Sequence, residues 1–226
     1  MSDGQDYEPG DRRPIASRRL GWVKATASWM VRRKVSPNGI SVMSTVFAVA
    51  GAAAILGADR ASGSSARLSW FGAAALMQLR LLANLFDGMV ALESGRASPV
   101  GELFNEVPDR VSDAAVFIAL GLVVGSSPHL GYGAAVLAVF TAYLRAVGAA
   151  AGAGQIFAGV MAKPQRMFLV TLLCLFEAAA PDSWKGAWVG ETIGAPGVVL
   201  AVISIGCAVT AWTRLTAIAS KLRAGA

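Results

Sequence analysis

Long apolar stretches, separated by short polar connections, run through most of this chain. They predict six helices, at about residues 40–56, 68–92, 101–124, 132–151, 164–180 and 198–216. Each is close to the roughly 20 residues that an α-helix needs to cross the hydrocarbon of a bilayer. The pattern therefore predicts an all-α integral membrane protein with six transmembrane helices.

The stretch before the first apolar helix is polar and divides into two parts. Residues 1–15 are rich in Gly, Asp, Pro and Arg, which predicts a disordered tail. Residues 16–36 are basic and amphipathic, with two Trp among the Arg and Lys. This pattern favours an interfacial helix on the membrane surface over a soluble linker helix. Residues 37–226 then form the six-helix membrane domain.

Composition and charge agree with a multi-pass membrane protein. The 226 residues are 55% hydrophobic and 15% charged, with a mean hydropathy of +0.55 and a formal net charge of +6. Most cations fall in the N-terminal stretch, in the second and fourth connections and at the C-terminus. The positive-inside rule then places both termini, and any site beside them, in the cytoplasm. The excess charge suits anionic lipid headgroups, and no nucleic-acid motif accompanies it. Cys174 and Cys207 lie in apolar runs and are predicted to be buried thiols.

Ionisable residues interrupt the second and third apolar stretches. Because such groups are costly inside a membrane, they indicate function. One helical face is predicted to carry Asn84, Asp87, Gly88 and Ala91, and a stripe on the next helix to carry Gly101, Asn105, Asp109 and Asp113. If the two helices pack antiparallel, these faces meet. Clustered carboxylate and amide oxygens suit Mg²⁺ or Mn²⁺.

The same residues resemble the signature of the CDP-alcohol phosphotransferase family, D-x2-D-G-x2-A-R-x8-G-x3-D-x3-D. The spacing is kept without a gap, and Asp87, Gly88, Ala91, Gly101 and Asp109 match. Three positions differ, where Asn84, Leu92 and Asn105 replace Asp, Arg and Asp. The Pro37-Asn38 pair also resembles the dipeptide that precedes the first helix in that family.

The resemblance implies a six-helix membrane bundle, usually a homodimer, that acts in phospholipid biosynthesis. Such enzymes move a substituted phosphate from a CDP-alcohol, here expected to be CDP-diacylglycerol, to an acceptor alcohol and release CMP. In the family, four aspartates hold two divalent ions. The metal ligands that the resemblance implies are Asn84, Asp87, Asn105 and Asp109, and Asp109 is also the candidate base. Gly88, Ala91 and Gly101 would let the nucleotide approach closely.

A second prediction concerns basic residues near the same, cytoplasmic, end of the helices. Arg145, Lys163 and Arg166 fall where the family places cations for an acceptor phosphate or the lipid diphosphate. Positive-inside anchoring is the alternative interpretation.

The two asparagines remove two negative charges from the expected site, which predicts a single strongly bound ion. Candidate compensating residues are Arg80, Arg96, Glu106 and Asp113. For Arg80 the alternative is a salt bridge to Asp87 or Asp113, and for Asp113 it is a solvated helix end. Two other functions remain open. One is a non-catalytic member that kept the fold, which the asparagines favour. The other is a small transporter, which no internal repeat supports.

Overall fold

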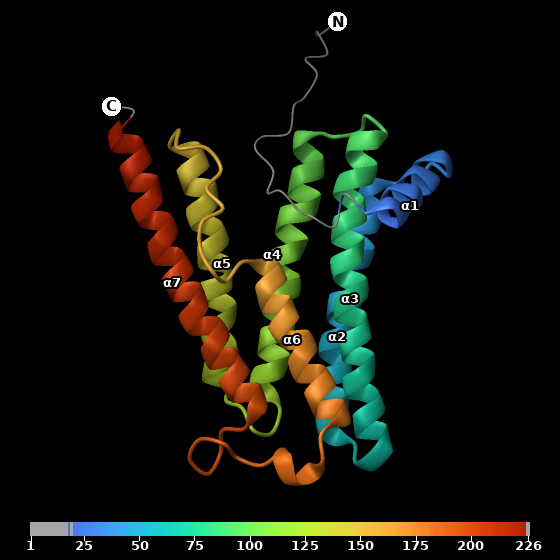
Figure 1. Ribbon diagram of the computed structural model, residues 1–226, viewed down its shortest axis with the longest axis vertical. Helices are drawn as coiled ribbons and strands as arrows, with labels where there is room; N and C mark the ends of the chain where they lie inside the picture. Colours follow the sequence, from blue (N-terminus) through green and yellow to red (C-terminus); the bar gives the residue numbers. More distant parts are fainter. Residues whose placement is uncertain (1–17, 19, 225–226) are drawn as a thin grey trace, which may run out of the picture.

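The computed structural model describes residue 18 and residues 20–224, and within these the chain is all-α. The predicted tail at residues 1–15 lies outside the described residues. The helices are α1 (Gly21–Arg32), α2 (Pro37–Arg60), α3 (Gly63–Glu93), α4 (Pro99–Leu122), α5 (Pro128–Ala150), α6 (Lys163–Ala179), the short 3-10 helix η2 (Asp182–Trp184) and α7 (Ala195–Ala224) (Figure 1).

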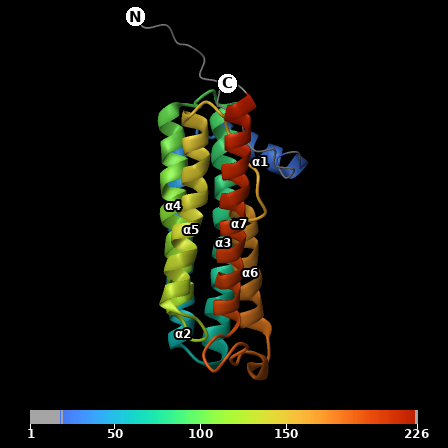
Figure 2. The ribbon, with the colours of Figure 1, turned by 90° about the vertical axis from the view of Figure 1, so that its left-hand side faces the viewer.

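Helices α2 to α7 run along one long axis, and α1 lies against the side of this bundle (Figures 1 and 2). The α3–α4 and α5–α6 connections lie where α7 ends, at the top of Figure 1, which we call the upper end. The α2–α3, α4–α5 and α6–α7 connections lie at the opposite, lower end. The start of α2 and the end of α7 are therefore on the same side of the bundle.

The two helices that carry the signature are bridged by other elements. Helix α2 packs against both α3 and α4, and α6 packs against α3. The predicted antiparallel direction is found, but α3 and α4 are not among the closely packed helix pairs. The polar side chains between them need room that a tight helix contact would not leave.

Helices α2 and α4 both begin with Ser-Pro. The Ser36 hydroxyl accepts a hydrogen bond from the Gly39 N–H at 3.4 Å, and the Ser98 hydroxyl accepts one from the Gly101 N–H at 3.0 Å. A serine cap satisfies a free backbone donor, and proline at the first helical position loses no intrahelical bond. Residues 37–39, which lie before the predicted start of the first apolar helix, are thus the first turn of α2.

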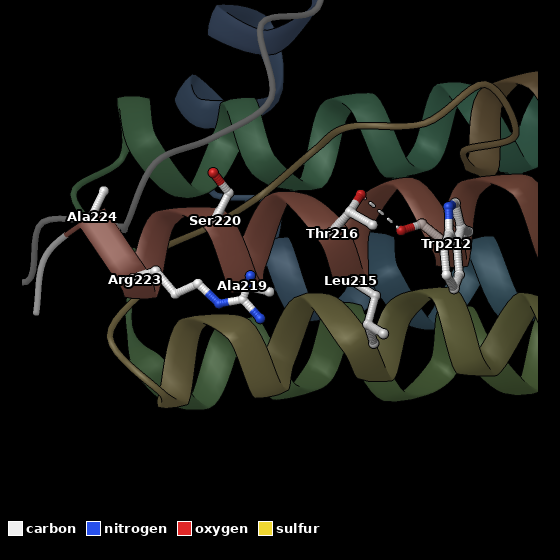
Figure 3. A pocket seen from close by; sticks show the side chains of 7 residues that line it. All are labelled: Trp212, Leu215, Thr216, Ala219, Ser220, Arg223 and Ala224. Atoms are coloured by element: carbon white, nitrogen blue, oxygen red, sulfur yellow. Dashed lines mark hydrogen bonds between the residues drawn. The ribbon is translucent and has the colours of Figure 1, made fainter.

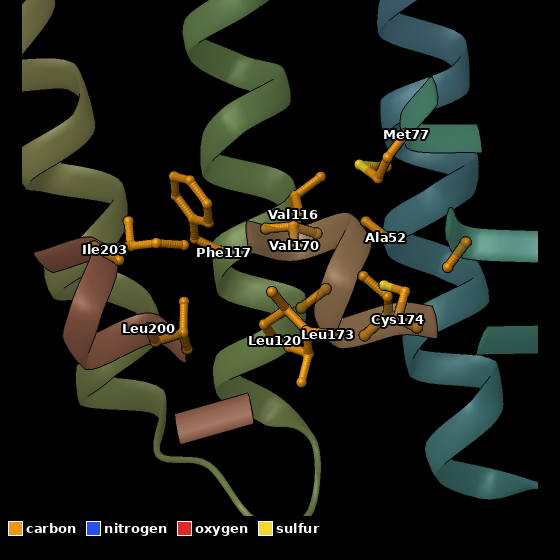
Figure 4. Close-up of a cluster of buried hydrophobic side chains, with 14 of the residues drawn as sticks. Ala52, Met77, Val116, Phe117, Leu120, Val170, Leu173, Cys174, Leu200 and Ile203 are labelled. Atoms are coloured by element: carbon orange, nitrogen blue, oxygen red, sulfur yellow. The ribbon is translucent and has the colours of Figure 1, made fainter. Parts of the chain in front are cut away.

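Apolar side chains fill the lower half of the bundle (Figure 4). This core brings together α2 to α7, and its members include Ala52, Met77, Val116, Phe117, Leu120, Ala134, Ala138, Val170, Leu173, Cys174, Leu200 and Ile203. Cys174 and Cys207 are both buried and free, as predicted. Small residues let α4 and α5 approach closely, since a Cβ on Gly121 would lie 2.7 Å from the Gly131 Cα. The core fixes the lower half and leaves the polar residues in the upper half.

Among the residues that the structure describes, four helices are long and apolar enough to cross a membrane: α2, α3, α5 and α7. Helix α4 carries Glu106, Asp109, Arg110 and Asp113, and α6 has only 17 residues. The structure therefore supports an all-α integral membrane protein, and the count of six spans stays a prediction.

Helix α1 forms the second, smaller apolar cluster, at the upper end. Its Val23 and Ala27 are buried with residues of α2 and α3. The Trp22 and Phe86 rings pack in a T-shaped arrangement with 6.5 Å between centroids, and the Ser28 hydroxyl donates to Glu93 at 2.5 Å. These contacts dock α1 beside the end of α3 that carries the signature.

Residues 151–162 connect α5 to α6 without a regular helix and descend from the upper end (Figure 1). Helix α7 holds this segment. The Met161 N–H donates to the Thr210 hydroxyl at 2.9 Å, and the Arg214 Nε donates to the Ala158 carbonyl at 3.0 Å. Because α6 starts partway down the bundle, its first residues, Lys163 and Arg166, enter the interior.

Candidate functional site

Asp87 lies on α3 and is only 3% exposed. The Ser41 hydroxyl, from α2, donates to its Oδ2 at 2.8 Å, and the Gly88 N–H donates to its Oδ1 at 2.5 Å. One turn earlier, the Asn84 Nδ2 is buried without a hydrogen-bond partner. The two side chains therefore form a polar face that keeps unused hydrogen-bonding capacity inside the protein.

Asp109 lies on α4, directly after Pro108 in the helix interior, and is 8% exposed. The Lys163 Nζ, from the first residue of α6, lies 2.5 Å from both carboxylate oxygens. Arg80 and Arg110 are farther away, at 3.7 and 3.8 Å from one oxygen each. Lys163 and Asp109 are both close enough to Asp87 to act on its charge. The signature carboxylates of α3 and α4 thus share one site with Lys163.

Asp113, one turn further along α4, is 1% exposed and binds two buried arginines. Its Oδ1 accepts from Arg80 at 2.5 Å and its Oδ2 from Arg166 at 2.6 Å. Arg80 also contacts the Met167 sulfur at 2.7 Å, and Arg166 donates to the Met161 carbonyl at 3.0 Å. This geometry matches the salt-bridge interpretation of Arg80. Asp113 is a buried counter-ion here, and not the solvated helix end that was the alternative.

Glu106 and Arg145 form the upper edge of the site. The Arg145 Nη2 lies 2.7 Å from Glu106, whose side chain is 45% exposed, and Arg110 reaches the same carboxylate at 3.2 Å. Arg145 also donates to Gln155 at 2.8 Å and lies over the ring of Phe157 at 5.7 Å. These contacts tie the α5–α6 segment to α4 at the rim of the carboxylate cluster.

The remaining predicted residues lie around this cluster without contributing an ion pair. Gly88, Ala91, Gly101 and Asn105 are half-buried on the two signature helices. Arg96 is exposed in the turn between α3 and α4.

Two residues near the site had not been predicted. Arg214 is 6% exposed and donates to the carbonyls of Ala158 and Thr141. Arg214 could have been predicted from the sequence, because an arginine within an apolar stretch indicates function. Ser41, which holds Asp87, carried no such signal, because a lone serine is common in membrane helices.

Within residues 20–224, no three Asp, Glu, His or Cys side chains are placed to hold a metal together. Three nearby carboxylates, Glu106, Asp109 and Asp113, already bind protein cations. A metal here depends on Asp87 together with amide oxygens. The buried Asn84 amide fits this role, because its nitrogen and oxygen exchange on a flip of the side chain. The donor set therefore fits one divalent ion at Asp87 and Asn84.

A separate hollow runs along the last turns of α7 (Figure 3). Its lining is Trp212, Leu215, Thr216, Ala219, Ser220, Arg223 and Ala224. Trp212 is 70% exposed, as expected for a side chain that faces lipid. None of these residues takes part in the carboxylate cluster.

No protein-family model matches the sequence. A curated relative, the phosphatidylinositol phosphate synthase of Streptomyces avermitilis, is 30% identical over 91 residues. The match spans 40% of this chain and only 34% of that relative.

Solved structures of the Mycobacterium tuberculosis phosphatidylinositol phosphate synthase match over much more of the chain. The structure with CDP-DAG bound is 19% identical, covers 87% of this chain and 92% of that one, and has a TM-score of 0.66. The structure with manganese and citrate is 20% identical, covers 87% and 88%, and has a TM-score of 0.68. At this identity the match shows a shared fold.

Proposed function

We propose that this chain, whose resemblance to the CDP-alcohol phosphotransferase family the comparisons confirm, is an active membrane phosphotransferase. It would move a substituted phosphate from a CDP-alcohol, most simply CDP-diacylglycerol, to an acceptor alcohol and release CMP. One observation carries the proposal: Asp87 and Asp109, from different helices of the signature, are both buried, Lys163 pairs with Asp109, and both of these charges act on Asp87. A structural relative with CDP-DAG bound supports the donor.

The proposed cofactor is Mg²⁺ or Mn²⁺, and a relative solved with manganese supports it. Asp87 and Asn84 would hold the ion, with the Asn105 amide as a further signature ligand. When bound, a divalent ion stabilises negative charge on a transferring phosphate and on its leaving group. Ser41 orients Asp87, and the small residues Gly88, Ala91 and Gly101 leave room for the nucleotide. Asp109 is the proposed base for the acceptor hydroxyl.

We assign binding of the acceptor phosphate to the cations beside the carboxylate cluster. Arg145 and Lys163 keep 18% of their side chains exposed, whereas Arg166 keeps 2% and is held by Asp113. Arg145 and Lys163 are therefore the better placed of the three to meet a ligand. Arg166 contributes by fixing Asp113, as Arg80 does from α3.

We further propose six membrane spans with both termini and the site in the cytoplasm. Asp109 and Asp113 of α4, and Arg166 and Glu177 of α6, would be costly in lipid and are buried in the bundle, which supports crossing by these two helices. Lys24 and Arg32 of α1, Arg96, and Lys221 and Arg223 in the last turn of α7 lie toward the upper end, whereas Arg60, Arg67 and Lys185 lie toward the lower end. Exposed Trp22 and Trp29 on α1 suit the membrane interface. A homodimer is expected from the resemblance.

The testing experiment measures CMP release from CDP-diacylglycerol by purified protein, across a panel of acceptor alcohols, with and without Mg²⁺. Wild type should release CMP with at least one acceptor, and only with the metal. Asp87→Asn should abolish release, because it removes the signature carboxylate of α3. Asp182→Asn is the matched control, since this exposed aspartate lies at the lower end beside Arg67.

The rival is a non-catalytic member of the family, which Asn84, Asn105 and the Lys163–Asp109 ion pair favour. If wild type binds neither Mn²⁺ nor CDP-diacylglycerol, or if Asp87→Asn behaves like wild type, the rival replaces the enzyme.

A further inference from the structure

The carboxylate of Asp109 already has a cation bound to it. Both of its oxygens lie 2.5 Å from the Lys163 Nζ, so the ammonium covers the edge that a metal ion would use. The pair is largely removed from water, with 10% of the Asp109 side chain and 18% of the Lys163 side chain exposed. At that burial the two charges interact strongly and are poorly screened.

The position of Lys163 in its helix also depends on this pair. It is the first residue of α6, and the first turn of α6 contains no acidic residue. A cation at a helix N-terminus faces the positive end of the helix dipole, which is unfavourable. Asp109 supplies the compensating charge from α4. A metal ion at the same carboxylate would have to displace the ammonium and meet Arg80 and Arg110 nearby.

A charge count leads to the same conclusion. Four signature aspartates carry −4, which two divalent ions neutralise. Here Asp87 and Asp109 carry −2, Lys163 adds +1, and one divalent ion brings the site to +1. A second ion would raise it to +3 before any nucleotide bound. Asp113 does not offset this, because it already faces Arg80 and Arg166.

We infer that the Lys163 ammonium replaces the second divalent cation at Asp109, so that this chain binds one ion. The inference rests on the proposed function, because it concerns the same site. It makes the Lys163 ammonium a cation that the protein itself supplies to the site.

The test counts bound Mn²⁺ by electron paramagnetic resonance on purified full-length protein with CDP-diacylglycerol present. Wild type and Asn105→Asp should each bind one ion, because Lys163 still covers Asp109. The double variant Asn105→Asp/Lys163→Met should bind two, with the second site at least about tenfold tighter than in Asn105→Asp alone. Asn105→Asp/Lys163→Arg keeps the charge and should bind one. Asn105→Asp/Lys185→Met is the control, since Lys185 lies at the lower end, and it should also bind one.

Two bound ions in wild type or in Asn105→Asp would overturn the inference and leave the proposed function standing. One ion in the double variant with Met would do the same. Binding of no Mn²⁺ by wild type would overturn both. Two ions bound by wild type would overturn the inference without any variant, so the test stays falsifiable even where a variant fails to fold.

Discussion

Replacing Asp113 by Asn tests whether this residue is a counter-ion or a metal ligand. The carboxylate binds Arg80 and Arg166 at 2.5 and 2.6 Å, and the two arginines are 0% and 2% exposed. Removing one partner of a buried ion pair costs about 3–5 kcal/mol, because the other charge stays buried. Asn keeps the shape of Asp and one acceptor oxygen, so the loss in free energy of unfolding should stay within that range although two arginines lose their counter-ion. For a chain of this length, the unfolding temperature should fall by on the order of 10 °C.

The assay follows thermal unfolding in detergent with a thiol-reactive fluorophore. Cys174 and Cys207 are both buried, so labelling reports loss of the core. Asp182→Asn is the control, because its ion pair with Arg67 is exposed, and it should leave the unfolding temperature unchanged. Folded Asp113→Asn protein should still bind Mn²⁺. An unchanged unfolding temperature together with lost Mn²⁺ binding would show that Asp113 is a ligand and refute the reasoning.

Three further results are expected. Ser41→Ala should weaken Mn²⁺ binding by about tenfold, because the Ser41 hydroxyl orients Asp87. Ser44→Ala is the control and should leave Mn²⁺ binding unchanged, since Ser44 donates to a backbone carbonyl. Equal effects of the two substitutions would show that Ser41 does not position Asp87. Arg145→Gln should raise the KM for the acceptor more than that for CDP-diacylglycerol, and an unchanged acceptor KM would return Arg145 to an anchoring role. A reporter after the last residue should be cytoplasmic and one within residues 183–190 external, and finding both on one side would exclude six spans.

The fold was largely predictable because apolar helix length is read directly from the sequence. The helix limits were less accurate. The structure extends α7 to Ala224 and starts α3 at Gly63, beyond the apolar windows, because polar helix ends leave no hydropathy signal. The direction of α3 and α4 was also predictable, from the short turn between them. Their separation was not, since it depends on how α2 and α6 pack.

The candidate site was predictable in its residues but not in its pairing. Spacing along the two helices identified Asp87 and Asp109 from one sequence. It did not show that Lys163, 54 residues further on, would cover Asp109. Nor did it show that Asp113 would bind Arg166. Such contacts depend on where α6 enters the bundle, and that is set by the irregular segment 151–162.

The late position of α6 in the chain has a consequence for membrane insertion during synthesis. Helix α4 carries Asp109 and Asp113. Arg80 of α3, which pairs with Asp113, is made earlier, but Lys163 and Arg166, which pair with Asp109 and Asp113, are made only after α5. Each charged residue at the centre of an inserting helix costs about 2.5–3.5 kcal/mol at the translocon. We therefore expect α4 to be a poor independent insertion signal. Its transmembrane orientation would become fixed only when α6 emerges, and a chain truncated before Lys163 would be a target for quality control.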